Sequence, residues 1–571
     1  MSPADMPRPR PASTGTRIAV WRAALGAQPA EFALPPEPRS IGSAAIGQAI
    51  CRGEIQLGGR RRDLGGGTIW DLAPLPPRAE ADRHGFAWLD DLAAAGTRQA
   101  RGLARDWTAA WLTRFGSGRG PGWRADIAGR RLVRWVNHAG MLAAGSDPAA
   151  ARRFRRALSA QALYLSRAWR RAPQGLPTFE AVCSLIQAGL ALRDMESRIR
   201  PAVKALERLC RDQVGPAGEL PGRNPEELLD LFSLLVWCAT ALEEAGLAAQ
   251  PQHLGAIARI APVLRALRHA DGGLARFHGG GRGVEGRLDA ALAGSRSRSP
   301  AAPGRAMGFA RLARGRSTVI IDAAPPPSGP GPGLTGHAST LAFEMTVGRR
   351  PMVVNCGSGL SFGADWELAA RAAPAHSVLV PDGEGQQAFR TVRRNWSMLV
   401  RGPRDVRCDP APHRGPAALD ASHDGYAARL GLIHHRSLDL GDEGLVLHGE
   451  DRLVPVAGAA PGLRGLQGAG FTIRFHLHPD VTLQPGEDGL SATLLLKSGE
   501  VWQFRHASPA RLSLDPSVYL EKTRPQPTPT RQIVLDASAS GATTTIRWSL
   551  SRVTQAAPGA RDLYRDDMSI T

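Results

Sequence analysis

The sequence predicts an α-helical domain followed by an antiparallel β-sandwich or β-barrel. Amphipathic patterns, with apolar residues three and four positions apart, fill residues 84–295. Short alternating apolar runs separated by glycine, proline and aspartate fill residues 306–555. A block of helices followed by a block of strands indicates separate domains rather than interleaved α/β units.

The helical half begins after residues 1–83, which we expect to form an N-terminal extension that packs on the helical domain and holds small strands in CRGEIQLGG and GGTIWDL. The clearest helix start precedes PEELLDLFSLLVWCATALEEAG. Asn224 is a favoured N-cap residue, Pro225 suits the first helical position, and Glu227 follows three residues after the cap. Successive helices joined by short turns predict helical hairpins, in either a bundle or a closed ring.

The strand half contains a predicted hairpin at residues 335–359, TGHASTLAFEMTVGRRPMVVNCGSG. Two alternating apolar runs flank a Gly-Arg-Arg turn, and His337 stands at the mouth. Ten of the fifteen histidines lie in this half of the chain, which indicates chemistry there. Residues 556–571 are predicted to be a C-terminal tail.

The formal net charge of +19 is compatible with a polyanionic partner. Only three of the 71 basic residues are lysines, which is typical of a GC-rich coding sequence, and the basic stretches lack interleaved aromatic residues. We therefore expect no nucleic-acid partner. The six cysteines show no paired spacing, and the N-terminus carries neither a clear signal peptide nor a transmembrane run. Taken alone, these features predict a soluble, cytoplasmic protein of unknown oligomeric state.

Several motifs follow one another in an order that suggests a family. Gly336-His337-Ala338, Asn355-Cys356-Gly357 and Ala375-His376-Ser377 precede SHDGYAARLGLIHHRSLDL, HGEDRL, IRFHLHP and LKSGEVWQF; the helical half holds FAWLDDL, GRRLVRWV, RNPEELLDL and LRHADGGLARFHGG. The pattern resembles the heparinase II/III family of polysaccharide lyases, in a divergent branch, over nearly the whole chain from about residue 50. The resemblance implies an α/α toroid, an incomplete helical barrel, at 84–295 and a heparinase II/III-like β-sandwich at 306–555.

The resemblance also implies a function. Family lyases cleave an acidic, uronic-acid-containing polysaccharide by β-elimination, in a cleft between the helical and β domains. A base removes the proton next to the uronate carboxylate, a neighbouring group neutralises that carboxylate, and an acid protonates the departing oxygen. The alternative is a catalytically altered relative that binds or remodels a cell-envelope glycan. Family members act in the periplasm or cell envelope, whereas the missing export signal leaves a cytoplasmic location as the alternative.

The candidate catalytic residues are His337, His376, Tyr426 and Asn224. Tyr426 is one of few tyrosines, and its alternative role is packing at a strand edge. Asn224 is already explained as a helix cap. Tyr164, the only tyrosine before residue 300, lies in an amphipathic helix and predicts a core or surface role.

The candidate substrate-binding residues come from both halves of the chain. Arg223 has the fork geometry to pair with a substrate carboxylate, and its alternative role is a solvated surface arginine. His278 lies on a glycine-rich loop of the kind that often carries binding residues. The remaining candidates are Asn137, His138, His423 and His434.

The family's metal ligands are partly replaced in this chain. The resemblance places Thr335 where the family has its first histidine, Ser339 where it has an acid, and Asn355 where it has an aspartate. His337, Asn355 and His376 can still converge on a divalent metal, Zn or Ca, although an amide is a poor zinc ligand. A divalent metal is the one cofactor that the sequence suggests.

Overall fold

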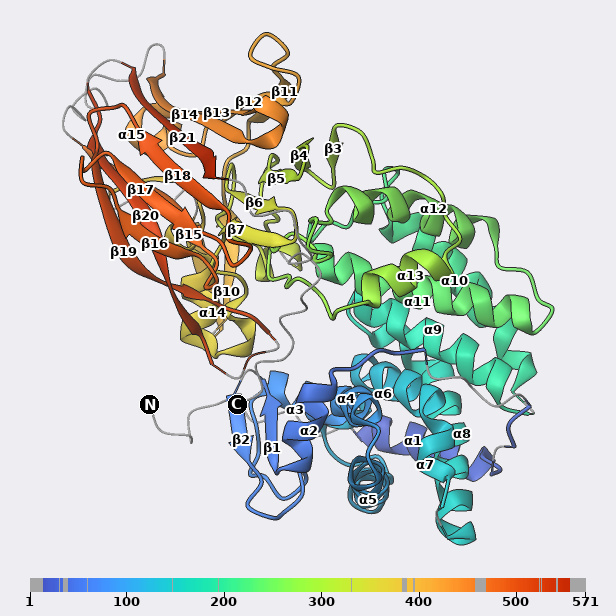
Figure 1. Cartoon of the computed structure of the whole chain (residues 1–571). Coiled ribbons are helices and arrows are strands. Elements are labelled where there is room, and N and C mark those ends of the chain that lie inside the picture. The colour runs from blue at the N-terminus through green and yellow to red at the C-terminus, as the bar shows by residue number, and fades with distance from the viewer. Residues whose placement is uncertain are drawn as a thin grey trace. The chain divides into compact units, whose positions relative to one another are not determined.

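The structure is a computed structural model that describes residues 14–29, 31–33, 39–58, 60–145, 147–193, 195–329, 331–382, 388–393, 396–456, 469–522, 524, 526–540 and 543–554 (Figure 1). The tail predicted at 556–571 lies outside the described residues. None of the helices within these ranges combines the length and the apolar character that crossing a membrane requires.

The chain divides into two compact units. Unit 1 comprises residues 1–218, 227–261 and 284–299, and unit 2 comprises residues 219–226, 262–283 and 300–571. Unit 1 is mainly helical and unit 2 is mainly β, which confirms the predicted order of helices followed by strands. Two segments from within the predicted helical half, 219–226 and 262–283, pack with the strands, and their side-chain contacts explain why (see below).

Unit 1 is built from helices with short connections. They are α1 (Thr14–Gly26), α2 (Ala44–Cys51), α3 (Pro77–Gly85), α4 (Ala87–Ala95), α5 (Arg98–Phe115), α6 (Ala125–Asn137), α7 (Ala139–Ala143), α8 (Pro148–Ala168), α9 (Leu176–Ala191), α10 (Ile199–Gln213), α11 (Pro225–Glu244), α12 (Pro251–Ala266) and α13 (Arg287–Gly294). Helix α11 begins at Pro225, and the side-chain oxygen of Asn224 accepts the backbone N–H of Glu226 at 3.0 Å. The predicted helix cap is thus confirmed.

The N-terminal strands are only partly as predicted. β1 (Glu54–Leu57), within CRGEIQLGG, pairs antiparallel with β2 (Arg60–Asp63). The strand expected in GGTIWDL is wrong. Asp71 accepts hydrogen bonds from the backbone and hydroxyl of Thr68 at 2.8 and 2.7 Å, which closes a turn instead.

The core of unit 1 is rich in tryptophan and encloses the guanidinium group of Arg131. The guanidinium carbon of Arg131 lies 4.1 Å from the ring centre of Trp111, with Trp123 and Trp135 also beside it. Burial lowers the pKa of Arg131 to about 9. Tyr164 is buried edge-on to Trp123, with ring centres 5.2 Å apart, so its role is in the core. This packing fixes the helices that carry the unit's polar side chains.

Unit 2 is built on two antiparallel sheets. One has the order β11-β12-β13-β14-β21-β18-β17-β16; the other runs β19-β20-β15-β7-β6-β5-β4-β3, with β8 also paired to β15. The first holds β11 (Val406–Pro410), β12 (Ala418–His423), β13 (Leu432–Gly441), β14 (Val446–Pro455), β16 (Thr482–Pro485), β17 (Ser491–Leu495), β18 (Val501–His506) and β21 (Thr544–Thr554). The second holds β3 (Arg305–Ala306), β4 (Phe309–Arg314), β5 (Ser317–Asp322), β6 (Phe343–Val347), β7 (Arg350–Val354), β8 (Leu379–Pro381), β15 (Gly470–Leu477), β19 (Arg511–Tyr519) and β20 (Thr528–Ser538).

Smaller elements complete unit 2. They are the hairpin β9 (Ala388–Arg393) and β10 (Trp396–Arg401), and the helices α14 (Ala364–Arg371) and α15 (Ala427–Leu430).

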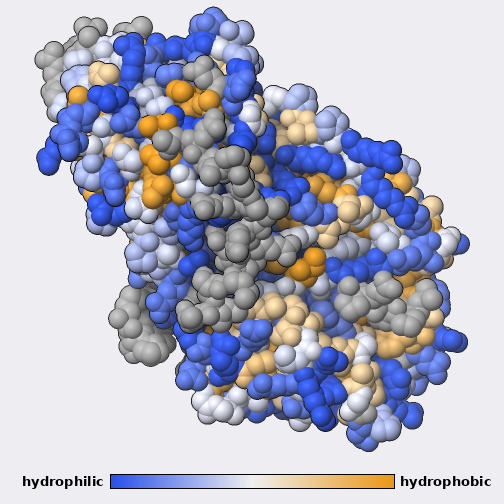
Figure 2. All heavy atoms as spheres, viewed as in Figure 1, coloured by the Kyte–Doolittle hydropathy of each residue, from blue (hydrophilic) through white to orange (hydrophobic). Residues whose placement is uncertain are grey.

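Aromatic rings fill the interior of the unit: Phe343 and Trp548 stack with centres 5.7 Å apart, and Phe475 meets Trp548 edge-on at 4.7 Å. On the face drawn in Figure 2, hydrophilic residues predominate and apolar residues form small separate patches.

The hairpin predicted at 335–359 is confirmed as β6 and β7, which pair through Met345 and Val353 and turn at Gly348 with φ +54°. Glycine is favoured at this turn because its φ is positive. The whole of β6 is buried, unlike the half-exposed strand that alternation suggests, because β6 lies inside the sheet with both faces covered. His337 precedes β6 by a loop of several residues rather than starting the strand.

Candidate functional site

His337 lies in the loop before β6, held by hydrogen bonds on both sides. Its own backbone N–H donates to Nδ1 of His278 at 3.2 Å. The backbone N–H of Ala338 donates to the Arg371 carbonyl at 2.8 Å, and the Arg371 side chain donates to the Gly336 carbonyl at 2.9 Å. These bonds hold the backbone at His337 in place although the residue is not part of a strand or helix.

His337 and His376 form a hydrogen-bonded pair. Nδ1 of His337 lies 3.2 Å from Nε2 of His376, and the rings are nearly perpendicular at 76°. Nδ1 of His376 is 2.9 Å from the Ala372 carbonyl, which can only accept, so this nitrogen carries the proton. In the neutral ring Nε2 of His376 is then an acceptor, and Nδ1 of His337 donates to it. The lone pair of His337 is therefore on Nε2, which has no hydrogen-bond partner among the described residues.

Burial keeps both rings of this pair neutral. His337 and His376 are 3% and 1% exposed. Burial lowers the pKa of His376 to about 4. Burial, together with the neighbouring imidazoles of His376 and His278, holds the pKa of His337 well below its ordinary value. Because a neutral imidazole can accept a proton, the pair is in the form that a general base requires.

Asp322, at the end of β5, is a buried carboxylate that the sequence analysis missed. Its Oδ2 accepts the Ser339 hydroxyl at 2.7 Å and lies 3.3 Å from Nε2 of His278. Nδ1 of His278 accepts the N–H of His337, so Nε2 carries the proton and faces the carboxylate. Burial opposes the charge on Asp322, but Arg223 and these donors hold its pKa well below its usual range. An aspartate on a neighbouring strand thus lies beside Ser339, the position where an acid was expected.

Arg223 uses all five of its N–H groups within unit 2. The acceptors are the carbonyls of Met307, Gly308, Ala324 and Pro325, at 2.8 to 3.2 Å, and the carboxylate of Asp322. These bonds tie residues 219–226 to the strands. A substrate carboxylate, which the sequence suggested as the partner of Arg223, would have to displace one of them.

Left-handed backbone conformations concentrate around Asp322. Arg223, His278, Met307 and Leu341 have φ of 48°, 49°, 50° and 65°. Such angles are uncommon for residues other than glycine and persist where the surrounding structure over-determines them. Leu341 donates its backbone N–H to the Asp322 carbonyl at 2.8 Å. The strain therefore lies in the same segments that hold His278 and His337 in place.

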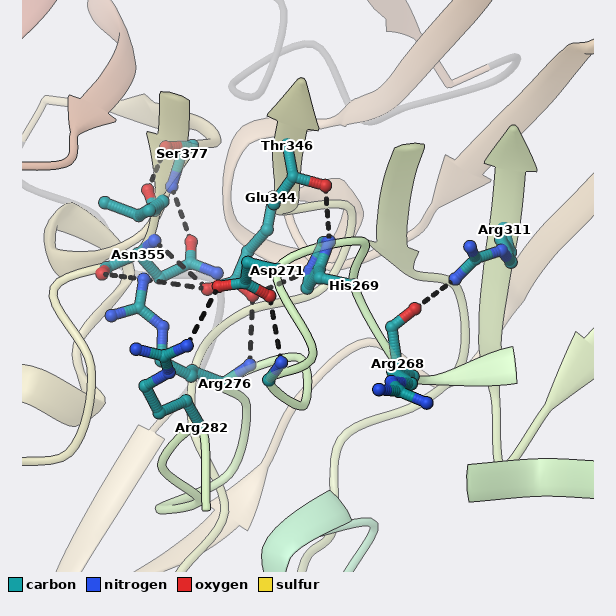
Figure 3. Close-up of polar contacts among 12 residues, drawn as sticks. Arg268, His269, Asp271, Arg276, Arg282, Arg311, Glu344, Thr346, Asn355 and Ser377 are labelled. Atoms are coloured by element: carbon teal, nitrogen blue, oxygen red, sulfur yellow. Dashed lines mark hydrogen bonds and ion pairs between the residues drawn. The ribbon is translucent and has the colours of Figure 1, made fainter. Parts of the chain in front are cut away.

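A second buried cluster surrounds Glu344 on β6 (Figure 3). Its carboxylate accepts the backbone and side-chain N–H groups of Arg276 at 3.0 and 3.2 Å and lies 3.3 Å from Nε2 of His269. Burial alone would raise the pKa of Glu344, but Arg276 and His269 lower it to about 2. These contacts explain why residues 262–283, which begin in the last turn of α12, pack with the strands.

Asn355 links Glu344 to the segment that carries His376. Its Oδ1 accepts the backbone N–H of Ser377 at 3.0 Å, and its own backbone N–H donates to Glu344 at 3.4 Å (Figure 3). Its Nδ2 is buried and has no hydrogen-bond partner among the described residues. Asn355 therefore keeps one donor group that the fold does not use.

These residues do not fit a tightly held divalent metal. The two imidazole nitrogens of His337 and His376 face each other, but Oδ1 of Asn355, the expected third ligand, already accepts the Ser377 N–H. Within the described parts of the chain, no group of three or more histidine, cysteine, aspartate or glutamate side chains is arranged to hold a metal ion. The predicted zinc or calcium site therefore lacks a complete ligand set.

Tyr426, His423 and His434 form their own buried set in unit 2. The Tyr426 hydroxyl donates to the Leu379 carbonyl at 2.8 Å, and its ring lies edge-on to His423. His423 and His434 are 3.3 Å apart between ring nitrogens, and His434 lies 2.8 Å from Asp451. The contacts described above for His337 and His376 include none of these three side chains.

The two candidates in unit 1, His138 and Asn137, differ in their side-chain contacts. Nε2 of His138 lies 2.8 Å from Asp90 and 3.1 Å from the Ser40 hydroxyl. Asn137, the last residue of α6, is 2% exposed, and its Nδ2 has no hydrogen-bond partner among the described residues. Asp90 was not predicted, although the paired acids of FAWLDDL were a visible signal.

The chain is similar to known proteins both in sequence and in fold. Residues 296–549 match the family model "Heparinase II/III-like, C-terminal". Over 490 residues the chain is 32% identical to "FtsZ-localized protein C" of Caulobacter vibrioides, and the alignment covers 83% of this chain and 82% of that protein.

Two solved structures share the fold. Heparinase III superposes with a TM-score of 0.65 at 11% identity, covering 94% of this chain and 89% of the other. Heparan sulfate lyase HepC from Pedobacter heparinus superposes with a TM-score of 0.55 at 14% identity, covering 95% and 88%. At these identities the likeness shows the fold alone, and it confirms the predicted helical toroid followed by a β-sandwich.

Proposed function

The chain belongs to the heparinase II/III family, and from this premise we propose that it is a carbon–oxygen lyase that cleaves a uronic-acid-containing polysaccharide by β-elimination. The observation that carries the proposal is that Nε2 of His337 has no hydrogen-bond partner in the part of the chain that the structure describes. Its tautomer is set by His376, whose own tautomer is set by the Ala372 carbonyl. A base whose lone pair is fixed on one nitrogen suits removal of a weakly acidic carbon-bound proton.

In the proposed reaction His337 Nε2 takes the proton from C5 of the uronate. The electron pair of the C5–H bond forms the C4–C5 double bond, the C4–O bond breaks, and its electron pair leaves with the glycosidic oxygen. That oxygen takes up a proton, and the protonated His337 is the donor that the described contacts offer. The step needs no oxidant or reductant.

Neutralisation of the uronate carboxylate is assigned to Asn355 in this proposal. Its buried Nδ2 has donors with no acceptor among the described residues, and Asn355 adjoins the His376 segment through Ser377. A hydrogen-bond donor aimed at a developing negative charge lowers the barrier most where water is excluded. Arg223, which the sequence suggested as the partner of the substrate carboxylate, already has partners within unit 2.

The proposal is tested by incubating the full chain with a panel of acidic polysaccharides. The product, an unsaturated uronate, is followed by its ultraviolet absorbance. We expect His337→Ala to lower the rate by about 10²- to 10⁴-fold, the range typical of a lost general base. His413→Ala, which removes an exposed histidine, is the matched control and should leave the rate unchanged. A wild-type rate retained in His337→Ala, with unchanged circular dichroism, would contradict the assignment.

A second candidate function is binding or remodelling of a cell-envelope glycan without β-elimination. Thr335 in place of the family histidine favours it, as does similarity to a relative named for its localisation with FtsZ. We propose the same localisation for this chain, to be tested by imaging a fluorescent fusion beside labelled FtsZ. Saturable glycan binding with no unsaturated uronate from any polysaccharide would support this candidate over the lyase.

A further inference from the structure

Unit 1 contains a cavity of about 1070 Å³ that the proposed lyase chemistry does not use. Small-molecule sites typically enclose roughly 300–1,000 Å³, so this cavity is large enough for a ligand of several groups. Its walls come from residues 40–42, the end of α4, the first half of α5, and α7. Most lining residues are small or apolar, and no acidic side chain is among the described residues that line it.

Three arginines line the cavity from one face of α5. Arg98, Arg101 and Arg105 are three and four residues apart, which places them on the same side of the helix. At about 1.5 Å of rise per residue they extend over roughly 10 Å along the axis. Thr97 caps the helix through the Ala100 N–H at 3.1 Å, so α5 begins at Arg98.

Among the described residues, no acidic side chain pairs with any of these three arginines. Arg101 donates to the Gly96 carbonyl at 2.7 Å and Arg105 donates to the Ala144 carbonyl, both neutral acceptors. Arg98 has neither an ion pair nor a hydrogen bond among the described residues. Like charges at this helical spacing repel one another, and an anionic ligand would relieve that repulsion.

The wall beside His138 is held in place before any ligand binds. His138 is 2% exposed, and its Nε2 lies 2.8 Å from Asp90. The Ser40 hydroxyl donates to the same carboxylate at 2.8 Å, and Arg134 donates to it at 2.9 Å. A wall fixed by such a network loses little conformational freedom when a ligand enters.

From this charge and shape we propose that the cavity binds a ligand carrying two or more oxyanion groups, with Arg98, Arg101 and Arg105 as the contacts. Guanidinium groups pair with phosphate, sulfate and carboxylate in bidentate fashion. A phosphorylated small molecule and a sulfated or carboxylated glycan segment share this chemistry. The inference uses residues of unit 1 only and does not rest on the proposed lyase function.

Isothermal titration calorimetry on the full chain tests the proposal with two probes, inorganic tripolyphosphate and a sulfated heparin-type tetrasaccharide. The first variant is the triple change Arg98→Gln, Arg101→Gln and Arg105→Gln. The second is Gly140→Glu, which places a carboxylate in the cavity at a position where an added Cβ meets nothing within 4 Å. Arg114→Gln is the matched control, because Arg114 lies on the same helix but outside the cavity and pairs with Asp71 at 2.7 Å.

We expect at least one probe to saturate the wild-type chain, with affinity that falls as salt rises. Removing each guanidinium should weaken binding by about tenfold, the size of a charge-assisted hydrogen bond. Gly140→Glu should weaken it as well, and Arg114→Gln should not. The probe that binds identifies the source of the ligand. Failure of both probes to saturate, or a triple variant that keeps its circular dichroism and binds like the wild type, would overturn the proposal.

Discussion

Two hydrogen-bonded histidine pairs in unit 2 differ at one ring nitrogen. In one pair this nitrogen lacks a hydrogen-bond partner among the described residues, and in the other it donates to a carboxylate. In the first, the Ala372 carbonyl fixes the tautomer of His376 and His376 fixes that of His337, whose Nε2 has no partner among the residues that the structure describes. Both rings are buried and both have lowered pKa values.

The second pair, His423 and His434, ends in a carboxylate. The Gly425 N–H donates to Nδ1 of His423 at 3.0 Å, so Nε2 of His423 carries the proton and donates to Nδ1 of His434 at 3.3 Å. Nε2 of His434 then donates to Asp451 at 2.8 Å. Every ring nitrogen of this pair has a partner.

The comparison teaches that burial and a lowered pKa do not distinguish a candidate base from a structural histidine. Burial lowers the pKa in both pairs. The difference is the last hydrogen-bond partner, because only a nitrogen with an unused lone pair can take a proton from a substrate. The His337–His376 pair is open in this sense, and the His423–His434 pair is closed.

The largest expected effect comes from breaking the closed pair at Asp451. This carboxylate accepts two N–H groups of Arg436, at 2.8 and 3.0 Å, and the Trp548 indole N–H at 2.9 Å. Asp451→Asn leaves the fully buried Arg436 without its counter-charge, and such a loss typically costs about 3–5 kcal/mol. Urea unfolding at pH 7 measures it.

Asp405→Asn is the control for that measurement, because Asp405 pairs with Arg407 at the surface and both side chains are more than half exposed. Exposed pairs contribute about 0–1 kcal/mol. Equal stability losses in the two variants would show that Asp451 does not hold the closed pair together.

Protonation of His376, in the open pair, should make the free energy of unfolding depend on pH. The pKa of His376 is about 4 in the folded chain, below the ordinary value of about 6.5 that applies when the chain is unfolded. As the pH falls, His376 takes up its proton in the unfolded chain before it does so in the folded chain. Its contribution to the free energy of unfolding is therefore fully present above about pH 6.5 and is lost as the pH falls toward about 4. His376 alone contributes roughly 3 kcal/mol to that decline, or about 1.4 kcal/mol per pH unit.

Urea midpoints between pH 4.5 and 7 in the wild type and in His376→Gln measure this contribution. The variant should show a shallower decline, whereas His413→Gln, a change at an exposed residue, should reproduce the wild-type slope. Identical slopes in the wild type and His376→Gln would mean that the His376 ring is protonated as readily in the folded chain as in the unfolded one.

Local sequence patterns predicted the elements well because their causes are local. Asn224 and Pro225 mark the start of α11 since capping depends on adjacent residues, and the turn at Gly348 follows from its neighbours in the hairpin. The family resemblance brought His337 and His376 into one hypothesis, and the structure places them 3.2 Å apart.

The partners of these residues were not predictable in the same way. Asp322 looks like an ordinary strand end in STVIIDA, and its role depends on Ser339 and His278 from distant segments. Arg223 resembles a free surface arginine until the four carbonyls around it are known. Such contacts are set by tertiary packing, which one sequence does not reveal.

The smallest expected effect is the loss of stability on replacing Asn224. It tests whether this residue is only a helix cap or also a catalytic group. Asn224 accepts the Glu226 N–H at 3.0 Å at the start of α11, and Asn224→Ala should cost about 1 kcal/mol of stability in urea unfolding. Asn224→Ser retains a capping oxygen and should restore most of that loss. Neither change should alter the rate of uronate formation, because the cap makes no contact with His337 among those described. If both variants lost activity while Asn224→Ser kept its stability, Asn224 would be catalytic after all, and the open pair would have a partner beyond His376 and His278.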